Sequence, residues 1–198
     1  LQYPQALSVS LNSIGLVAYH QGNLDRAQQA MEEALKISQR LGNQHFESTL
    51  LNNLSMMATE QGKYANARQY LKQALKLANM SGDLSSQGLI YTNLGLNEHR
   101  ALSLESAVKY LENGLRIFQS IGDRALIAQN MYFLGESYRE QGSTSQAESL
   151  YQQSRTIAQD VGARFFECQS LIGLTLLFQN INEAVSYTHL TLPTTRLV

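Results

Sequence analysis

The chain has 198 residues and a formal net charge of −1, and 43% of its residues are hydrophobic. Its near-zero charge provides no basic surface of the kind that nucleic acids require, and no apolar run approaches the roughly 20 residues that span a bilayer. The single cysteine excludes an internal disulfide. Because the two prolines, Pro4 and Pro193, lie near the ends, the sequence between them is free to be helical.

One pattern of two helices is clearest in residues 51–78. Before Gly62, apolar or small residues occupy positions i, i+3, i+4 and i+7: Leu51, Leu54, Ser55 and Ala58. After Gly62, a similar helical spacing relates Ala67, Leu71, Ala74 and Leu75. This spacing predicts two amphipathic helices joined by a short turn. The small residues Ser55 and Ala67 allow the two backbones to approach closely.

In chain order, the same unit is expected at residues of about 5–43, 44–83, 84–123 and 124–163, and its first helix again at 164–184. A shift of 40 residues aligns the small first-helix positions Gly15, Ser55, Gly95, Gly135 and Thr175, the second-helix positions Ala27, Ala67, Ala107 and Ala147, and the helix ends Gly42, Gly82, Gly122 and Gly162. Because one helix pair cannot bury both of its faces alone, we expect the units to stack. The predicted fold is an all-α solenoid of antiparallel helix pairs.

Polar residues mark the expected helix starts. Asn43, Asp83 and Asp123 directly follow the helix-ending glycines and suit the N-cap of the next helix. Ser143 precedes Gln146 by three residues, which is the spacing of a capping box. Asn43, Asp83 and Asp123 place the start of a first helix at the same offset in successive units, and Ser143 marks the start of the fourth unit's second helix.

The repeated unit resembles the tetratricopeptide repeat, in the subgroup found in kinesin light chains, Leu-Gly-Asn repeat proteins and many bacterial regulators. The 40-residue period departs from the usual period of about 34 residues. The first aromatic position of the family holds Ala18, Ala58 and Glu98, and only Tyr138 matches. The resemblance implies a right-handed superhelix whose concave groove holds an extended peptide or a partner helix.

The two ends depart from the repeat. Leu1 aligns with Leu41 at the end of a second helix, so we expect the chain to begin inside a larger array. Residues 185–198 resemble a translated sequencing-adapter sequence and are predicted to be a non-native tail. The alternative is a natural C-terminal strand or partner-binding tail.

No residue pattern indicates a metal site, a phosphate-binding loop or a catalytic site. His20, His45 and His99 are not paired with Cys, His or carboxylates at metal-ligand spacing, and Gly22 and Gly62 stand singly in turns rather than in a phosphate-binding loop. We therefore expect no metal, no cofactor and no enzymatic activity in this segment.

The groove side of each first helix follows from helical geometry. Rotation of about 100° per residue places a second set of positions away from the core face. The expected peptide-binding residues are Asn12, Asn52, Asn53, Met56, Asn93, Leu96, Arg100, Tyr132, Phe133, Glu136 and Arg139.

Asn53 and Asn93 occupy the same offset, where the resemblance implies a ladder of amide hydrogen bonds to a ligand backbone. Ser13 is a weaker substitute at this offset, and Phe133 and Gly173 interrupt the ladder. We expect Tyr132 and Phe133 to form an apolar anchor. Two alternatives stay open: the asparagines are ordinary exposed helix residues, and Phe133 only packs against the adjacent unit.

The sequence favours a protein–protein interaction scaffold that is part of a larger regulatory or adaptor protein. The alternative is the sensor or regulatory arm of a signalling enzyme or transcription regulator, such as a histidine kinase, nucleotide cyclase, protease or DNA-binding activator, whose effector domain lies outside this segment. The expected partner is a protein or peptide, with no nucleic acid, membrane or small-molecule cofactor, and the expected location is cytoplasmic.

Overall fold

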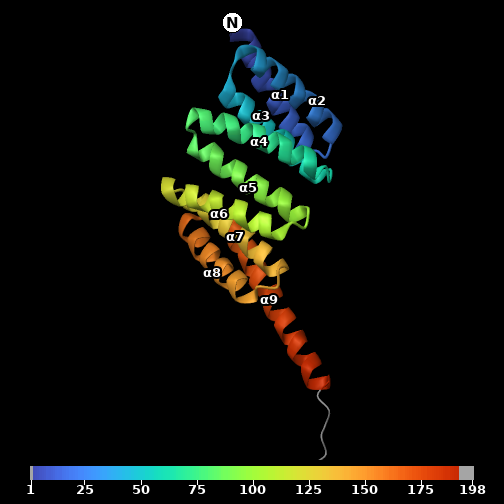
Figure 1. Cartoon of the computed structure of the whole chain (residues 1–198), viewed down its shortest axis with the longest axis vertical. Coiled ribbons are helices and arrows are strands. Elements are labelled where there is room, and N and C mark those ends of the chain that lie inside the picture. Colours follow the sequence, from blue (N-terminus) through green and yellow to red (C-terminus); the bar gives the residue numbers. More distant parts are fainter. Residues whose placement is uncertain (1, 192–198) are drawn as a thin grey trace, which may run out of the picture. The chain divides into compact units, whose positions relative to one another are not determined.

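The structure, a computed structural model, describes the backbone of residues 2–191 and the side chains of residues 3–179. Within this range the chain is helical apart from short turns and contains no strand. The helices are α1 (Gln2–His20), α2 (Leu24–Leu41), α3 (Gln44–Glu60), α4 (Tyr64–Ser81), α5 (Leu84–Arg100), α6 (Leu104–Ile121), α7 (Arg124–Glu140), α8 (Thr144–Val161) and α9 (Arg164–Thr191) (Figure 1). The predicted all-α repeat fold is confirmed, with four helix pairs followed by the first helix of a fifth.

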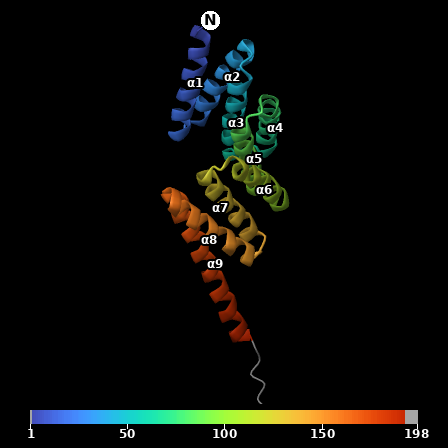
Figure 2. The ribbon, with the colours of Figure 1, turned by 90° about the vertical axis from the view of Figure 1, so that its left-hand side faces the viewer.

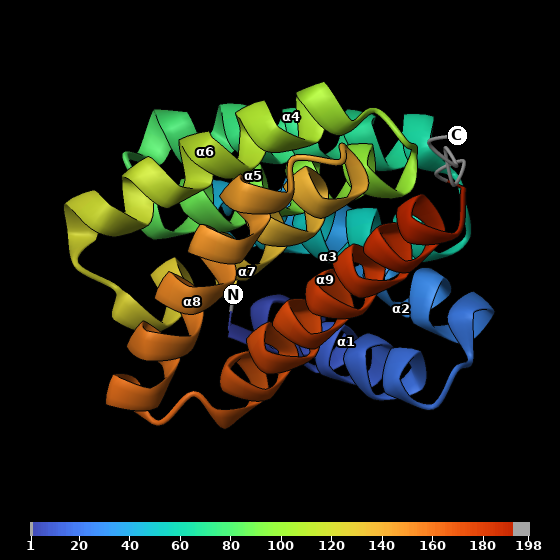
Figure 3. The same ribbon diagram turned by 90° about the horizontal axis from the view of Figure 1, so that it is seen from below.

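The helices form two compact units, which we describe separately. Unit 1 contains α1–α6 and ends at Asp123, and unit 2 contains α7–α9 and begins at Arg124. In unit 1, the pairs α1–α2, α3–α4 and α5–α6 follow one another, with α2 against α3 and α4 against α5 (Figure 2). In unit 2, α9 packs against both α7 and α8 (Figure 3).

In three of the helix pairs a glycine of the first helix faces a large residue of the second, Met31 in the case of Gly15. A Cβ atom added to Gly95 would lie 2.5 Å from Cγ of Leu111, and one added to Gly135 would lie 2.7 Å from Cε1 of Tyr151. The neighbouring second-helix residues Ala107 and Ala147 are fully buried. In these three pairs the helices approach closely, and the contact leaves no room for a larger side chain. The close approach at Ser55 and Ala67 stays a prediction.

Buried serine hydroxyls add a polar link between the helices of a pair. Ser8 donates to the carbonyl of Ala34 at 2.8 Å, and Ser48 donates to the carbonyl of Ala74 at 3.0 Å. In the third pair the equivalent residue is Gly88, and the ring of Phe118 fills the space, since an added Cβ would lie 2.5 Å from its Cε1 atom. The pair thus exchanges a hydrogen bond for aromatic packing at one position.

The turns within the pairs require a left-handed backbone. Gly22, Gly62 and Gly142 adopt φ angles of 76°, 73° and 78°. The third pair has Leu102 at this position, with φ 60° and a side chain that is 77% exposed. A residue with a Cβ atom pays about 1–2 kcal/mol in this conformation, and the exposed side chain gains little burial to offset it.

Two of the predicted N-caps are confirmed. The Asn43 carboxamide accepts the backbone N–H of Phe46 at 3.1 Å, and the Asp83 carboxylate accepts that of Ser86 at 3.0 Å. The predicted capping box at Ser143 is wrong, because Ser143 stands at the N-cap of α8 without a side-chain capping bond. The capping role of Asp123 stays a prediction, and α7 begins at the next residue.

Glu98 stands at the family's aromatic position and is 3% exposed. Its carboxylate accepts two hydrogen bonds from the Arg68 guanidinium, at 2.6 and 2.7 Å. Asn97 beside it accepts a bond from the Thr59 hydroxyl at 3.0 Å and donates to the Tyr64 carbonyl at 3.3 Å. A carboxylate can be buried when it is paired and hydrogen-bonded. The Arg68–Glu98 ion pair between α4 and α5 therefore takes the place of an aromatic ring.

All side chains of the predicted non-native tail lie outside the described side chains. The backbone of α9 continues to Thr191, and residues 192–198 lie outside the described residues. The assignment of residues 185–198 to an adapter stays a prediction.

Replacing Leu102 with Gly should stabilise the protein. Glycine adopts positive φ without steric cost, so we expect Leu102→Gly to raise the free energy of unfolding by about 1 kcal/mol. The reciprocal control is Gly62→Ala, which should lower it by a similar amount. Urea unfolding followed by circular dichroism measures both, and a Leu102→Gly variant less stable than wild type would contradict the strain at this turn.

Removing the Asp83 cap should destabilise the protein in a pH-dependent way. Hydrogen bonds from Ser86, first from its hydroxyl and then from its backbone N–H, hold the pKa of Asp83 below its usual value. At neutral pH, Asp83→Ala should cost about 1 kcal/mol. Because the folded-state pKa is depressed, this contribution is fully present above the unfolded-state pKa of about 3.9 and is lost as the pH falls through the folded-state value.

The control for this change is Ser143→Ala, which removes a cap residue without a side-chain capping bond and should alter the unfolding free energy by less than about 0.5 kcal/mol. The measurement is urea unfolding of the three proteins from neutral pH down to strongly acidic pH. An Asp83→Ala penalty that stays constant over this range would show that the carboxylate charge makes no contribution.

Candidate functional site

The first helices of unit 1 carry paired asparagine side chains. The Asn53 amide donates to the side-chain oxygen of Asn12 at 3.1 Å, which joins α3 to α1. The Asn93 amide donates to the side-chain oxygen of Asn52 at 2.8 Å, which joins α5 to α3. We call these four half-buried residues the amide face.

The amide face keeps hydrogen-bonding capacity beyond these pairs. A carboxamide has two N–H donors and two acceptor lone pairs, and each bond above engages one donor of one residue and one acceptor of the other. The mutual bonds fix the orientation of the side chains. An oriented amide that both donates and accepts is suited to the N–H and C=O groups of a peptide backbone.

Apolar and charged side chains flank the amide face. Met56 is 40% exposed, Leu96 is half-buried and Arg100 is exposed. The Tyr19 hydroxyl of α1 bonds to the Glu60 carboxylate of α3 at 2.5 Å. Burial, followed by this bond to Glu60, raises the pKa of Tyr19 to about 12, so the tyrosine remains a neutral donor at physiological pH.

Unit 2 carries an aromatic cluster on α7 and α9. Tyr132 and Phe133 have ring centroids 5.3 Å apart, and Phe166 of α9 lies 6.2 Å from Tyr132 and 6.1 Å from Phe133. Phe165 contacts Phe166 and is 65% exposed. Centroid distances in this range are typical of favourable aromatic pairs. The cluster presents apolar surface to solvent at the start of α9.

A buried tyrosine supports the charged residues beside this cluster. Tyr151 of α8 is fully buried between Gly135 and Gly173, because a Cβ added to either glycine would lie 2.7 Å from its ring. Its hydroxyl donates to the Glu136 carboxylate, which also accepts a bond from Arg139 at 2.9 Å. Burial is the main cause that raises the pKa of Tyr151, and the bond to Glu136 raises it further.

The ion pair also affects Arg139. The hydrogen bond to Glu136 raises the pKa of Arg139 above its usual range. Glu136 and Arg139 therefore form an ion pair, and the Tyr151 hydroxyl holds the Glu136 carboxylate in place. The two residues form a fixed dipolar group rather than two free charges.

The predicted site residues divide between the two units. The seven residues from Asn12 to Arg100 lie on the first helices of unit 1, and the four residues from Tyr132 to Arg139 lie on α7 in unit 2. Sequence reasoning missed Tyr151 and Phe166. Tyr151 is the aromatic member of the aligned series Met31, Leu71, Leu111 and Tyr151, a difference that could have indicated a specialised contact. Phe166 follows another phenylalanine at an offset outside the predicted groove positions.

Two kinds of feature are absent from the residues that the structure describes. These residues contain no group of three or more His, Cys, Asp or Glu side chains placed to hold a metal ion. They also contain no helix that is both long enough and apolar enough to cross a membrane.

The geometry defines a class of protein: an array of helix pairs whose first helices present polar and aromatic side chains. A family model for the tetratricopeptide repeat matches residues 6–80 and 86–160, and the chain belongs to that family. It is accordingly a repeat module of the kind used for protein interaction and sensing. No curated protein matches the sequence.

Solved structures share the fold at low sequence identity. BtubC from P. vanneervenii is 24% identical with a TM-score of 0.72, over 80% of this chain and 66% of that one. A signal transduction ATPase with a tetratricopeptide repeat sensor, from Pyrococcus horikoshii, is 20% identical with a TM-score of 0.78, over 88% and 26%.

A Rap protein complexed with Competence and Sporulation Factor is 14% identical with a TM-score of 0.77, over 90% of this chain and 50% of that one. The chain thus spans between about a quarter and about two thirds of the length of these three proteins. At these identities the likeness establishes the fold.

Loss of the Tyr151 hydroxyl should lower the free energy of unfolding more than loss of the Tyr132 hydroxyl. Tyr151→Phe removes a bond to a charged carboxylate and should cost about 1.5–3 kcal/mol of unfolding free energy. The matched control is Tyr132→Phe, which removes a bond to the neutral Gln169 amide at 3.2 Å and should cost about 0.5–1.5 kcal/mol. Chemical unfolding measures both, and a larger loss for Tyr132→Phe would contradict the supporting role of Tyr151.

Proposed function

We propose that the chain is a protein-interaction module that binds an extended peptide segment of a partner protein on the amide face of unit 1. The carrying observation is the pairing of Asn53 with Asn12 and of Asn93 with Asn52. These bonds pre-orient amide groups that retain further donors and acceptors, which lowers the conformational cost of binding a peptide backbone. The likeness to a Rap protein complexed with Competence and Sporulation Factor supports the proposal.

In this proposal the flanking side chains provide selectivity. Met56 and Leu96 contact apolar side chains of the peptide, while Arg100 meets an acidic side chain at the edge of the face. Unit 2 carries a separate candidate anchor for apolar side chains, formed by Tyr132 and Phe133, since aromatic clusters concentrate binding energy. The near-zero net charge agrees with a ligand that is neither strongly acidic nor strongly basic.

A second candidate function is the regulatory arm of a larger signalling protein. The observation that favours it is the likeness to the tetratricopeptide repeat sensor of a signal transduction ATPase, of which the chain spans 26%. In this case the same amide face binds the ligand and a separate domain gives the output. Sequencing the source gene outward from both ends distinguishes the candidates, because an effector domain in the same reading frame is required for the second one.

Removing the paired amides should weaken peptide binding. The probe is a peptide selected on the wild-type protein from a random library of short peptides, labelled for fluorescence anisotropy. We expect the Asn53→Ala, Asn93→Ala double variant to bind it at least about tenfold more weakly, because two oriented amide contacts of about 1 kcal/mol each are lost.

The matched control is Asn66→Ala with Asn79→Ala, which removes two exposed asparagines of α4 and should leave the affinity unchanged. Circular dichroism establishes that both double variants are folded. Equal affinity of all three proteins for the selected peptide would reject the amide face as the binding surface.

A further inference from the structure

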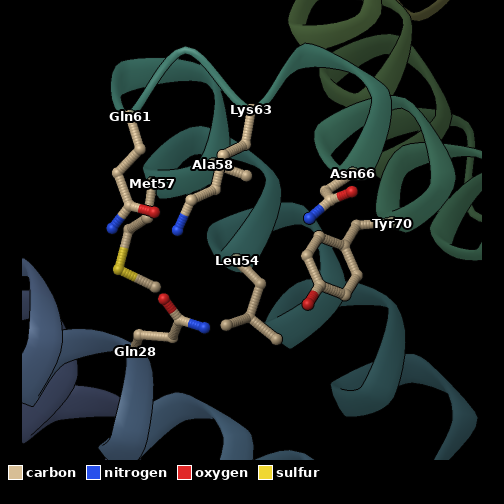
Figure 4. Close-up of a pocket in the computed structure, with 8 residues that line it drawn as sticks. All are labelled: Gln28, Leu54, Met57, Ala58, Gln61, Lys63, Asn66 and Tyr70. Carbon is tan, nitrogen blue, oxygen red and sulfur yellow. The ribbon is translucent and has the colours of Figure 1, made fainter.

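A pocket of unit 1 lies between α2, α3 and α4 (Figure 4). Its apolar wall is formed by Leu54 and Ala58 of α3, which are 2% and 7% exposed, and Gln28 of α2 lies beside them. Figure 4 shows the Gln61 amide and the Lys63 ammonium, from the turn between α3 and α4, directed into the same space. The pocket has a volume of ≈ 310 Å³, including open solvent, which is sufficient for a small molecule.

The pocket exists because Ala58 has a short side chain at a position that the next helix pair fills with a carboxylate. Ala58 stands where the family has an aromatic residue, and Glu98 occupies the same position 40 residues later. Glu98 is 3% exposed, and its carboxylate accepts two hydrogen bonds from the Arg68 guanidinium, at 2.6 and 2.7 Å. In the pair α5–α6, a carboxylate of the chain itself therefore occupies the place that forms the pocket beside Ala58.

The apolar surroundings of these two places are alike. Leu54 and Tyr70, which line the pocket, correspond to Leu94 and Tyr110 after a shift of 40 residues. Tyr70 packs against the buried cluster that contains Leu54, and Tyr110 packs against the buried cluster that contains Leu94. Ala58 thus lies in surroundings that hold a carboxylate elsewhere in the same protein.

The charge of the pocket favours an anion. The counterpart of Arg68 is Gln28, whose amide donates to the Glu32 carboxylate at 2.7 Å. The cation is instead Lys63, whose counterpart after the shift is Ser103, and its ammonium forms no ion pair among the described residues. None of the described residues that line the pocket carries a carboxylate. An ammonium next to an amide donor and an apolar wall complements a carboxylate with a short hydrocarbon chain.

We propose that this pocket binds the carboxylate of a small aliphatic acid, in the place that the Glu98 side chain occupies in the next pair. A glutamate side chain exceeds that of alanine by a methylene group and a carboxylate, so acetate supplies the atoms that Ala58 lacks. The carboxylate pairs with the Lys63 ammonium and accepts an N–H of the Gln61 amide, while the hydrocarbon part contacts Leu54.

The pocket lies on a different side of α3 from the amide face. Rotation of about 100° per residue separates Leu54 and Ala58 from Asn52, so binding at the pocket does not depend on the proposed function. Met57 lines the pocket, whereas Met56 flanks the amide face. The methyl groups of these two methionines therefore report on the two sites separately.

The test uses the full chain with ¹³C-methyl methionine, because the protein has five methionines and each gives one methyl signal. The probe is sodium acetate at neutral pH, with sodium chloride at equal ionic strength as its control. We expect the Met57 signal to shift and to saturate in the millimolar range, because the small number of ligand atoms limits the affinity. The Met56 and Met131 signals should not shift. The Met57→Leu variant identifies the Met57 signal.

Variants locate the charge and the space that bind acetate. Lys63→Met removes the ammonium and keeps an unbranched side chain, so it should weaken acetate binding at least about tenfold. The matched control is Lys76→Met, which changes an exposed lysine farther along α4 and should leave the affinity unchanged. Ala58→Glu places a carboxylate of the chain itself in the pocket and should abolish the saturable shift. Circular dichroism verifies that each variant retains its helical content.

Three results would overturn the proposal. The first is the absence of a saturable Met57 shift with acetate, or a shift that sodium chloride reproduces. The second is equal affinity of the wild-type protein and Lys63→Met for acetate. The third is a blocked tripeptide with a central glutamate that shifts the Met57 signal at a lower concentration than acetate does, because the occupant would then be an acidic side chain of a partner protein. A failure of the amide-face experiment would leave all three results unchanged.

Discussion

The close approach of the two helices in each pair is the constraint on which the rest of the structure depends. In three of the pairs a glycine of the first helix meets a large side chain of the second, and added bulk at Gly15, Gly95 or Gly135 would overlap Met31, Leu111 or Tyr151. Because these contacts turn one face of the first helix inward, side chains on the opposite face remain accessible to solvent. The packing that stabilises the pair thereby also selects the residues that form the candidate binding surface.

Each of the two units carries its own candidate surface, and the two surfaces differ in chemistry. In unit 1, Asn12, Asn52, Asn53 and Asn93 pair across neighbouring first helices and present oriented amides. In unit 2 the corresponding helix carries the aromatic residues Tyr132 and Phe133 instead of asparagines. The Tyr151 hydroxyl donates to Glu136, which pairs with Arg139. The same repeat scaffold therefore supports a face suited to backbone groups and a face suited to apolar side chains, because the inward contacts do not constrain the outward ones.

Departures from the repeat pattern are compensated within the pair or by its neighbour. Glu98 replaces an aromatic ring and is satisfied by Arg68, and Gly88 is matched by the large ring of Phe118. Leu102 has no such compensation, since its side chain is exposed while its backbone is left-handed. The repeats thus tolerate changes where a neighbouring side chain can adjust, and the turn at Leu102 carries the strain itself.

The sequence by itself determined the helices, their pairing and most of their ends. Helical periodicity, the small residues at Ser55 and Ala67 and the caps at Asn43 and Asp83 act over a few residues or within one pair, so they can be read locally. The tertiary structure decided the rest. Sequence alignment suggested a ladder at one offset, whereas the amides pair between two offsets, Asn53 with Asn12 and Asn93 with Asn52, because the sideways shift of adjacent helices sets which side chains meet. The buried contact from Tyr151 to Glu136 and the missing side-chain bond at Ser143 likewise depend on side-chain directions that only three-dimensional packing fixes.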